Sequence, residues 1–404
     1  MRGEAAPETM AEGDTSALSG RERTILAEAA RAGAELRGHS DEIAAARRLP
    51  ARFVERLSRA ELFTLCVPRA LGGPEVRAET LVRAIEAVAE GDASAGWCAA
   101  IASTSSLLAG WLEPEAARRI FSAPGAVAGG VFAPRGKAVR VPEGYRVSGR
   151  WSFASGCEHC TWLMGGCLVE GERRPELAAG GRPDVRLVLF PASSAEILDT
   201  WKVAGLEGTG SHDIVVHDLV VPEAHAVSLM TDRPRAAGPL YAFPAFGLLA
   251  LGIASVTLGI ARRALGEIRE LAAAKTPTLA QRRLAERPAT QSRVAEAEAL
   301  AGSARAYLLE TVRDVWERAA RTGELGLAER ARVRLAASFA VKQCVRAVDV
   351  AYELGGGSSI YLGSPLQRCL RDVHVVTQHM MVSDASLELA GRVLLGVDVD
   401  ASML

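Results

Sequence analysis

The spacing of apolar residues changes twice along this chain, and this change constrains the fold more than any other feature. From residue 21 to 124 apolar residues recur at helical spacing, as Ile25 and Ala29 illustrate. Between 125 and 235 short segments alternate with period two, and over 236–404 the helical period returns. The pattern predicts an α+β protein with an N-terminal helical domain, a central β-barrel-like or β-sandwich domain, and a C-terminal four-helix bundle.

Five segments of the central part have the composition of strands bounded by Gly, Pro and Asp. They are 137–141, 145–151, 162–169, 185–190 and 214–221. The first two form the clearest hairpin, because Pro142-Glu143-Gly144 supplies turn residues between them.

Bulk properties exclude several classes of protein. The chain has 404 residues, 47 Lys and Arg against 48 Asp and Glu, and a net charge of -1, so it offers no basic surface for nucleic acid. Residues 1–20 are polar and lack the apolar segment of a signal peptide, which predicts a disordered lead-in and a cytoplasmic protein. Seven cysteines, an odd number, are expected to be reduced core residues without a structural disulfide.

The segment 236–261 carries no charge and would be long enough to span a bilayer as one helix. Pro239 and Pro244 interrupt its first part, and Arg262 follows its end. Of the two alternatives, a membrane span and a helix buried in a large core, we expect the buried helix.

Familiar cofactor and metal motifs do not fit. The run 130–137 resembles a phosphate-binding loop but has one residue too many, and the glycines of 205–210 lack dinucleotide spacing. Cys157 and Cys160 form a single CxxC, whereas a structural zinc site needs a second ligand pair, and we expect no metal. His374 and His379 are five residues apart, which places them on well-separated helix faces rather than on the i, i+4 face that a metal ion needs.

Four segments taken together resemble the acyl-CoA dehydrogenase superfamily from about residue 21 to 395. They are GGVFAP at 129–134, RWSFASGCEHCTW at 150–162, WKVAGLEGTGSHDIVVHDLVVP at 201–222, and ELGGGSSIYLGSPLQRCLRDVHVVTQH at 353–379. The FASG segment, GTGSHD and a histidine shortly after RD are similar to the oxygenase branch, which contains two-component hydroxylases. The resemblance implies an enzyme that takes reduced FMN or FAD from a separate flavin reductase and hydroxylates a small aromatic or amine-bearing molecule with O₂ through a flavin C4a-hydroperoxide.

The expected base of a dehydrogenase is absent. Such an enzyme removes an acidic proton with a carboxylate. Its two positions in the family correspond here to Met380 and to the uncharged helix near Leu249. An acyl-CoA dehydrogenase with a relocated base and an N-hydroxylase of an amine or amino sugar remain alternatives.

The resemblance also implies site residues. Ser155 corresponds to the hydroxyl beside the flavin N5, where it can accept from N5-H and donate to the oxygen, and His379 to a histidine that faces the flavin as a base. Trp97 and Met380 are expected to line the substrate pocket. The remaining cofactor-binding residues are Phe132, Ala133, Gly156, Gly355, Gly356, Gly357 and Arg282.

Two further expectations concern partners and specificity. The C-terminal helices have more apolar surface than one chain can cover, and relatives assemble through that bundle, so a homotetramer is expected. Glu207 stands where relatives usually place arginine, which puts an anion contact there in doubt.

Overall fold

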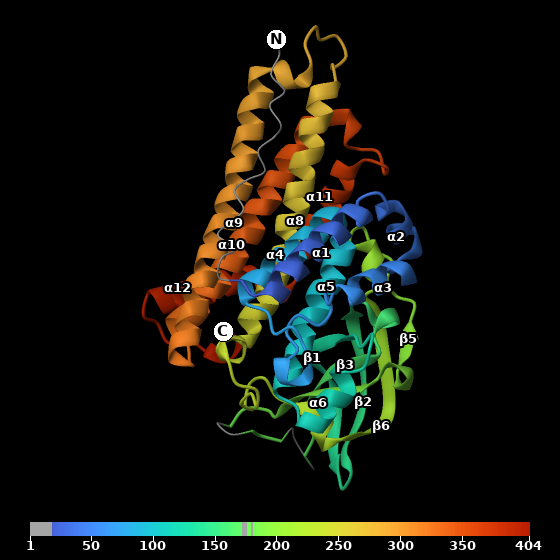
Figure 1. Cartoon of the computed structure of the whole chain (residues 1–404), viewed down its shortest axis with the longest axis vertical. Coiled ribbons are helices and arrows are strands. Elements are labelled where there is room, and N and C mark those ends of the chain that lie inside the picture. Colours follow the sequence, from blue (N-terminus) through green and yellow to red (C-terminus); the bar gives the residue numbers. More distant parts are fainter. Residues whose placement is uncertain (1–17, 172–175, 179–180) are drawn as a thin grey trace.

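The computed structural model describes residues 18–171, 176–178 and 181–404, and most of the expected lead-in at 1–20 lies outside them. The chain forms helices, then a sheet, then helices again (Figure 1). The α+β prediction is therefore confirmed. The N-terminal helices lie between the sheet and the long C-terminal helices, so all three parts meet around α5 (Ala93–Ser105).

The described residues of the N-terminal part form five α-helices besides α5. They are α1 (Gly20–Leu36), α2 (Ser40–Ala46), α3 (Ala51–Arg59), α4 (Ala78–Gly91) and α6 (Pro114–Phe121). Helix α5 is buried along nearly its whole length, and Asp92 caps its start by accepting from the Ala95 N–H at 2.9 Å. This buried helix carries Trp97 toward the sheet.

The central part is one seven-stranded sheet in the order β5-β6-β2-β1-β3-β4-β7. Only β1 and β3 run parallel among the described pairs; the other neighbours are antiparallel. The strands are β1 (Ala128–Val141), β2 (Gly144–Ala154), β3 (Trp162–Val169), β4 (Val185–Pro191), β5 (Glu196–Leu198), β6 (His212–Pro222) and β7 (Ala226–Val227). All five predicted strands are present, and the predicted hairpin joins β1 to β2.

The sheet folds around one aromatic side chain. Trp151 is fully buried, donates its indole N–H to the Gly166 carbonyl at 2.7 Å, and packs against Gly136, Gly149 and Gly165. A Cβ on any of those three glycines would come within 2.7 Å of the indole ring. The glycines therefore leave the volume that the ring fills.

The C-terminal part consists of helices, of which α8, α9 and α10 are long and the others are short. They are α8 (Ala245–Ala274), α9 (Pro288–Thr322), α10 (Leu327–Gly355), α11 (Pro365–Val376) and α12 (Asp384–Leu394), preceded by the short α7 (Pro239–Ala242). Helix α8 is long and apolar enough to cross a membrane, but 89% of its apolar window is buried against the rest of the chain. It packs on α4, α5 and α10, as a core helix does.

Candidate active site

Ser155 lies in the turn after β2, where the N-terminal helices meet the sheet. Its side chain is buried, and its Oγ accepts the indole N–H of Trp97 at 2.9 Å. The same Oγ lies 2.8 Å from Ser211 Oγ. A residue of α5 and a residue before β6 thus hold the hydroxyl that the sequence predicts beside the cofactor.

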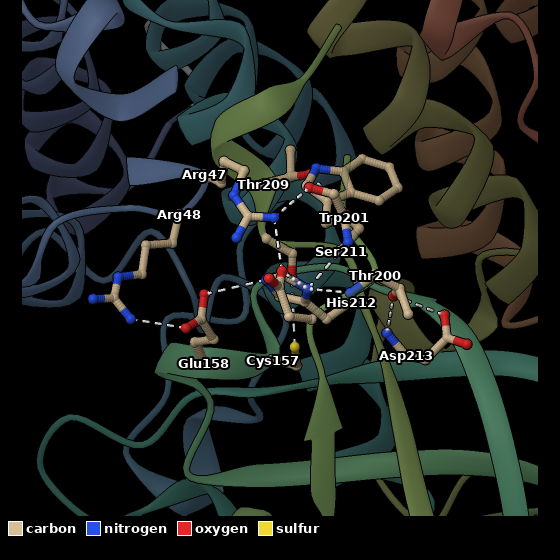
Figure 2. A network of polar contacts seen from close by, with 12 residues as sticks. Arg47, Arg48, Cys157, Glu158, Thr200, Trp201, Thr209, Ser211, His212 and Asp213 are labelled. Atoms are coloured by element: carbon tan, nitrogen blue, oxygen red, sulfur yellow. Dashed lines mark hydrogen bonds and ion pairs between the residues drawn. The ribbon is translucent and has the colours of Figure 1, made fainter. Parts of the chain in front are cut away.

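A chain of hydroxyl groups continues from Ser155 through the loop before β6. Ser211 Oγ lies 2.7 Å from Thr209 Oγ1 (Figure 2). Thr209 Oγ1 donates to the Leu206 carbonyl at 2.9 Å. The Leu206 N–H donates to Asp372 Oδ1 on α11 at 2.6 Å. Burial raises the pKa of Asp372 to about 7, with a further contribution from the Asp92 carboxyl.

His379 lies beside Trp97, with ring centroids 5.6 Å apart in an edge-on arrangement. It does not continue a helix: α11 ends at Val376, and the extended backbone of His379 begins a short 3₁₀ turn. The Met381 N–H donates to His379 Nδ1 at 3.3 Å. Burial, helped by the positive charge of Arg334, lowers the pKa of His379 to about 4, so the ring is neutral near pH 7.

The proton of a neutral imidazole occupies whichever ring nitrogen does not accept a hydrogen bond. Because His379 Nδ1 accepts from Met381, the proton is assigned to Nε2. Nε2 is then a donor, whereas the sequence-based role of base requires a free lone pair at that atom. His374 is separate from this site: it lies on α11 and pairs with Asp349 at 2.8 Å on the surface.

Phe153 is an aromatic residue that sequence reasoning missed. The residue is 71% exposed, its backbone has φ 69°, and its ring meets that of Trp201 edge-on, with the ring centroids 6.2 Å apart. A left-handed φ is strained for a bulky aromatic residue and marks sites where function maintains the strain. The only sequence signal is its position two residues before Ser155, and no local pattern reports the backbone angle.

The backbone of Phe132 and Ala133 departs from the regular sheet. Val131 pairs with Gly165 and Pro134 with Gly166, so two residues of β1 face no partner position on β3. Such a bulge interrupts the ladder, and the carbonyl groups of Phe132 and Ala133 lie over Gly166, where an added Cβ would meet them at 2.3 and 2.6 Å. The contact of these two residues with a planar cofactor ring stays a prediction.

His212 fixes the loop on the other side of Trp201. Its Nδ1 accepts the backbone N–H groups of Thr200 and Trp201, each at 3.2 Å, and its Nε2 lies 3.6 Å from Glu158 (Figure 2). Glu158 in turn pairs with Arg48 at 2.8 Å. His212 is therefore a structural histidine that orients the turn behind the site.

Several predicted residues are not brought to Ser155 within one chain. Gly355, Gly356 and Gly357 end α10 and precede α11, whose 12 residues span about 18 Å before His379 is reached. Arg282 is exposed in the loop between α8 and α9 at that same end of the bundle, where Lys275 donates to the Gly355 carbonyl at 2.8 Å. Their cofactor role stays a prediction.

Of the other residues singled out from the sequence, Gly156 lies next to Ser155, whereas the structure does not test the pocket role of Met380. Gly156 follows Ser155 in a left-handed conformation, and a Cβ there would meet the His159 ring at 2.7 Å. Met380 is 58% exposed in the single chain, so its pocket role also stays a prediction. Glu207 pairs with Arg371 at 3.0 Å.

The CxxC segment forms no metal site in the described part of the chain. No group of three His, Cys, Asp or Glu side chains is placed there to hold a metal ion. All seven cysteines are free and buried. Burial raises the pKa of Cys157 to about 12, which keeps this thiol protonated and unreactive.

Two family models match this chain. The acyl-CoA dehydrogenase N-terminal domain matches residues 21–116, and the acyl-CoA dehydrogenase C-terminal domain matches residues 251–384. The chain belongs to the acyl-CoA dehydrogenase superfamily.

Relatives of known activity define the branch. An indole-3-acetate monooxygenase of Pseudomonas putida is 33% identical over 83% of this chain and 84% of the relative. The oxygenase component of an FADH(2)-dependent resorcinol hydroxylase of Rhizobium sp. is 32% identical over 87% of this chain and 89% of the relative. Within the superfamily the chain is therefore a flavin-dependent monooxygenase of the two-component type.

Solved structures agree with this placement. The HsaA monooxygenase of M. tuberculosis superposes with a TM-score of 0.86 at 26% identity, over 95% of this chain and all of that one. XiaF of Streptomyces sp., solved with FADH2 and glycerol, gives a TM-score of 0.85 at 26% identity, over 93% of this chain and 96% of that one. The family prediction is confirmed.

Proposed function

We propose that this protein hydroxylates a small aromatic, phenol-like or indole-like metabolite, using reduced flavin supplied by a separate reductase. The observation that carries the proposal is the grouping of Trp97, Ser155 and neutral His379 at the junction of the three parts, with no carboxylate at the dehydrogenase positions Met380 and Leu249. The named relatives act on indole-3-acetate and resorcinol, which are both small electron-rich aromatic compounds.

The residues around Ser155 fit a bound flavin. The bulge at Phe132 and Ala133 offers backbone groups, Phe153 offers an exposed aromatic face, and Ser155 Oγ offers a hydrogen-bonding partner for N5. Reduced flavin supplies the activation of O₂ when it is bound. The chain must hold the ring in place and keep water from it.

His379 is proposed to act as a hydrogen-bond donor rather than as the base. Its Nε2–H is available because the Met381 N–H occupies Nδ1, and a pKa near 4 keeps the ring neutral. A neutral donor can stabilise negative charge that develops on an oxygen atom during transfer. Trp97 packs against the ring edge and limits its rotation.

We further propose that the working form is a homotetramer. Ile360, Tyr361 and Leu362 are 64%, 70% and 74% exposed, directly after the glycine run, and Leu394 and Leu395 are 71% and 81% exposed. Exposed apolar surface of this kind, here in two groups toward opposite ends of α10, marks an interface. A second copy placed on it would bring its own Gly355–Gly357 segment and Arg282 toward a flavin that extends beyond one chain.

The proposal is tested by supplying the protein with anaerobically reduced FMN or FAD, isotopically labelled O₂ and a panel of phenols, indoles and amines. We expect one label atom in an aromatic product, and only when reduced flavin is present. Labelled product from an amine would move the assignment to N-hydroxylation. Reduction of a dye by acyl-CoA without added reduced flavin would identify a dehydrogenase with a relocated base.

A further inference from the structure

The hydroxyl chain behind Ser155 has a fixed direction. A carbonyl oxygen cannot donate, so the Thr209 proton lies in its bond to the Leu206 carbonyl. Thr209 Oγ1 can therefore only accept from Ser211, so the Ser211 proton lies in the bond to Thr209. Ser211 Oγ can in turn only accept from Ser155, so the Ser155 proton lies in the bond to Ser211.

Trp97 occupies one of the two lone pairs of Ser155 Oγ. An indole nitrogen is only a donor, so its bond to Ser155 Oγ occupies one of the two lone pairs of that oxygen. The Ser155 proton and one lone pair are then used inside the protein, and one lone pair is left. Ser155 can therefore accept a hydrogen bond from a ligand, as expected from the sequence, but it cannot also donate one, contrary to that expectation, while these hydroxyl hydrogen bonds are intact.

The two redox states of a flavin differ at the atom that Ser155 would meet. In reduced flavin N5 carries a hydrogen and donates, whereas in oxidised flavin N5 presents a bare lone pair and accepts. An acceptor facing N5–H forms a hydrogen bond, and an acceptor facing a lone pair leaves two buried acceptors unsatisfied.

We infer that Ser211 and Thr209 are positioning residues that make the site selective for reduced over oxidised flavin. This inference rests on the proposed function. They act through Ser155 by fixing the direction of its proton, and they are not expected to touch the cofactor. The selectivity suits an enzyme that must capture reduced flavin from solution and release it oxidised.

The burial of the three hydroxyl groups supports a fixed direction of the hydrogen bonds between them. Ser155, Ser211 and Thr209 are 7%, 3% and 1% exposed, so solvent cannot readily replace any partner. Three donors share the two lone pairs of the Leu206 carbonyl: the Thr209 hydroxyl at 2.9 Å, the Thr209 N–H at 3.1 Å and the Trp201 indole N–H at 3.2 Å, of which the hydroxyl is the nearest. Leu206 itself is held by Asp372 through its N–H.

The test compares the dissociation constants of reduced and oxidised flavin, measured separately under anaerobic conditions with FMN and with FAD. Wild-type protein is expected to bind the reduced form more tightly. Ser211→Ala frees the Ser155 proton to turn toward oxidised N5, and the preference should fall by about ten-fold, equivalent to a decrease of about 30 mV in the two-electron midpoint potential of the bound flavin.

Two variants at Thr209 serve as a second test and as its control. Thr209→Val lets the Ser211 proton turn back toward Ser155, so it should also reduce the preference, and it carries the test if Ser211→Ala does not fold. Thr209→Ser keeps the hydroxyl and should retain the wild-type ratio.

The possible results distinguish the inferred selectivity for reduced flavin from the proposed function. An unchanged ratio in folded Ser211→Ala and Thr209→Val, or a wild-type protein that binds both redox states equally, overturns the inference and leaves the proposed function standing. A wild-type protein that binds neither reduced FMN nor reduced FAD overturns the proposed function itself.

Discussion

The Trp97 indole, on a helix of the N-terminal part, donates to Ser155 Oγ, in the turn after β2, at 2.9 Å. This bond joins two parts of the chain at the atom expected to meet the cofactor. It also gives Trp97 a role beyond that of an apolar wall, because the same ring lies edge-on to His379.

Trp97→Phe keeps an aromatic ring and removes the donor. We expect a loss of about 1 kcal/mol in the free energy of unfolding, since Ser155 keeps its contact with Ser211. The fraction of reduced flavin that yields product rather than H₂O₂ should fall, because both Ser155 and His379 lose orientation. Urea unfolding and an H₂O₂ assay measure the two effects. Wild-type coupling in this variant would mean that Trp97 is a packing residue only.

His379→Ala should still bind reduced flavin but lose hydroxylation by about 10²-fold, with H₂O₂ released instead. If His379 is a donor, raising the pH from 7 to 9 should not restore the oxidation of a phenol. If it is the base, higher pH should restore activity, because solvent then supplies the phenolate. His374→Ala, at a surface histidine paired with Asp349, is the matched control.

The pKa of His379 also predicts how the activity of the wild type depends on pH. Burial lowers the His379 pKa from 6.5 to about 4, so the neutral form persists as pH falls from 7 to 5 and is lost only on passing through about 4. We expect no activity titration from His379 between pH 5.5 and 8. A histidine-type transition near pH 6.5 that disappears in His379→Gln would contradict the assignment.

Phe153→Gly is expected to affect flavin affinity and the free energy of unfolding differently. Glycine adopts a positive φ without strain, so the variant should be as stable as the wild type or up to about 1 kcal/mol more stable. Its affinity for reduced flavin should nevertheless fall by about ten-fold, because an exposed aromatic face is lost. A marked loss of stability with unchanged flavin affinity would show that Phe153 is held only for packing.

The sequence predicted the order of the three parts because periodicity reports which face of an element is buried, and the five predicted strands fall within β1, β2, β3, β4 and β6. The short β5 and the first half of β1 were not predicted. Ser155 and His379 were identified only through family resemblance, although the structure brings both to Trp97. The left-handed backbone of Phe153, the bulge at Phe132 and the imidazole tautomer could not be predicted. Each depends on partners distant in sequence, such as β3 for the bulge.

The assembly gives a further prediction. Light scattering should report a tetramer, and Tyr361→Glu together with Leu362→Glu should produce smaller species, because charge on these exposed residues opposes burial. Reduced-flavin affinity should fall in the same variant if a partner chain completes the site. A monomeric wild type would contradict the proposed assembly.

We propose that this chain takes up reduced flavin and controls its reaction with O₂. The most direct measurement mixes the protein, loaded with anaerobically reduced FMN or FAD, with oxygenated buffer and follows the return of oxidised flavin and the appearance of H₂O₂. We predict that both appear at least about ten-fold more slowly than with free reduced flavin, and that Ser155→Ala shortens the delay, since one hydrogen bond to the cofactor contributes about 1 to 3 kcal/mol. If oxidised flavin and H₂O₂ appear as fast with the protein as without it, the chain does not control the reaction of reduced flavin with O₂.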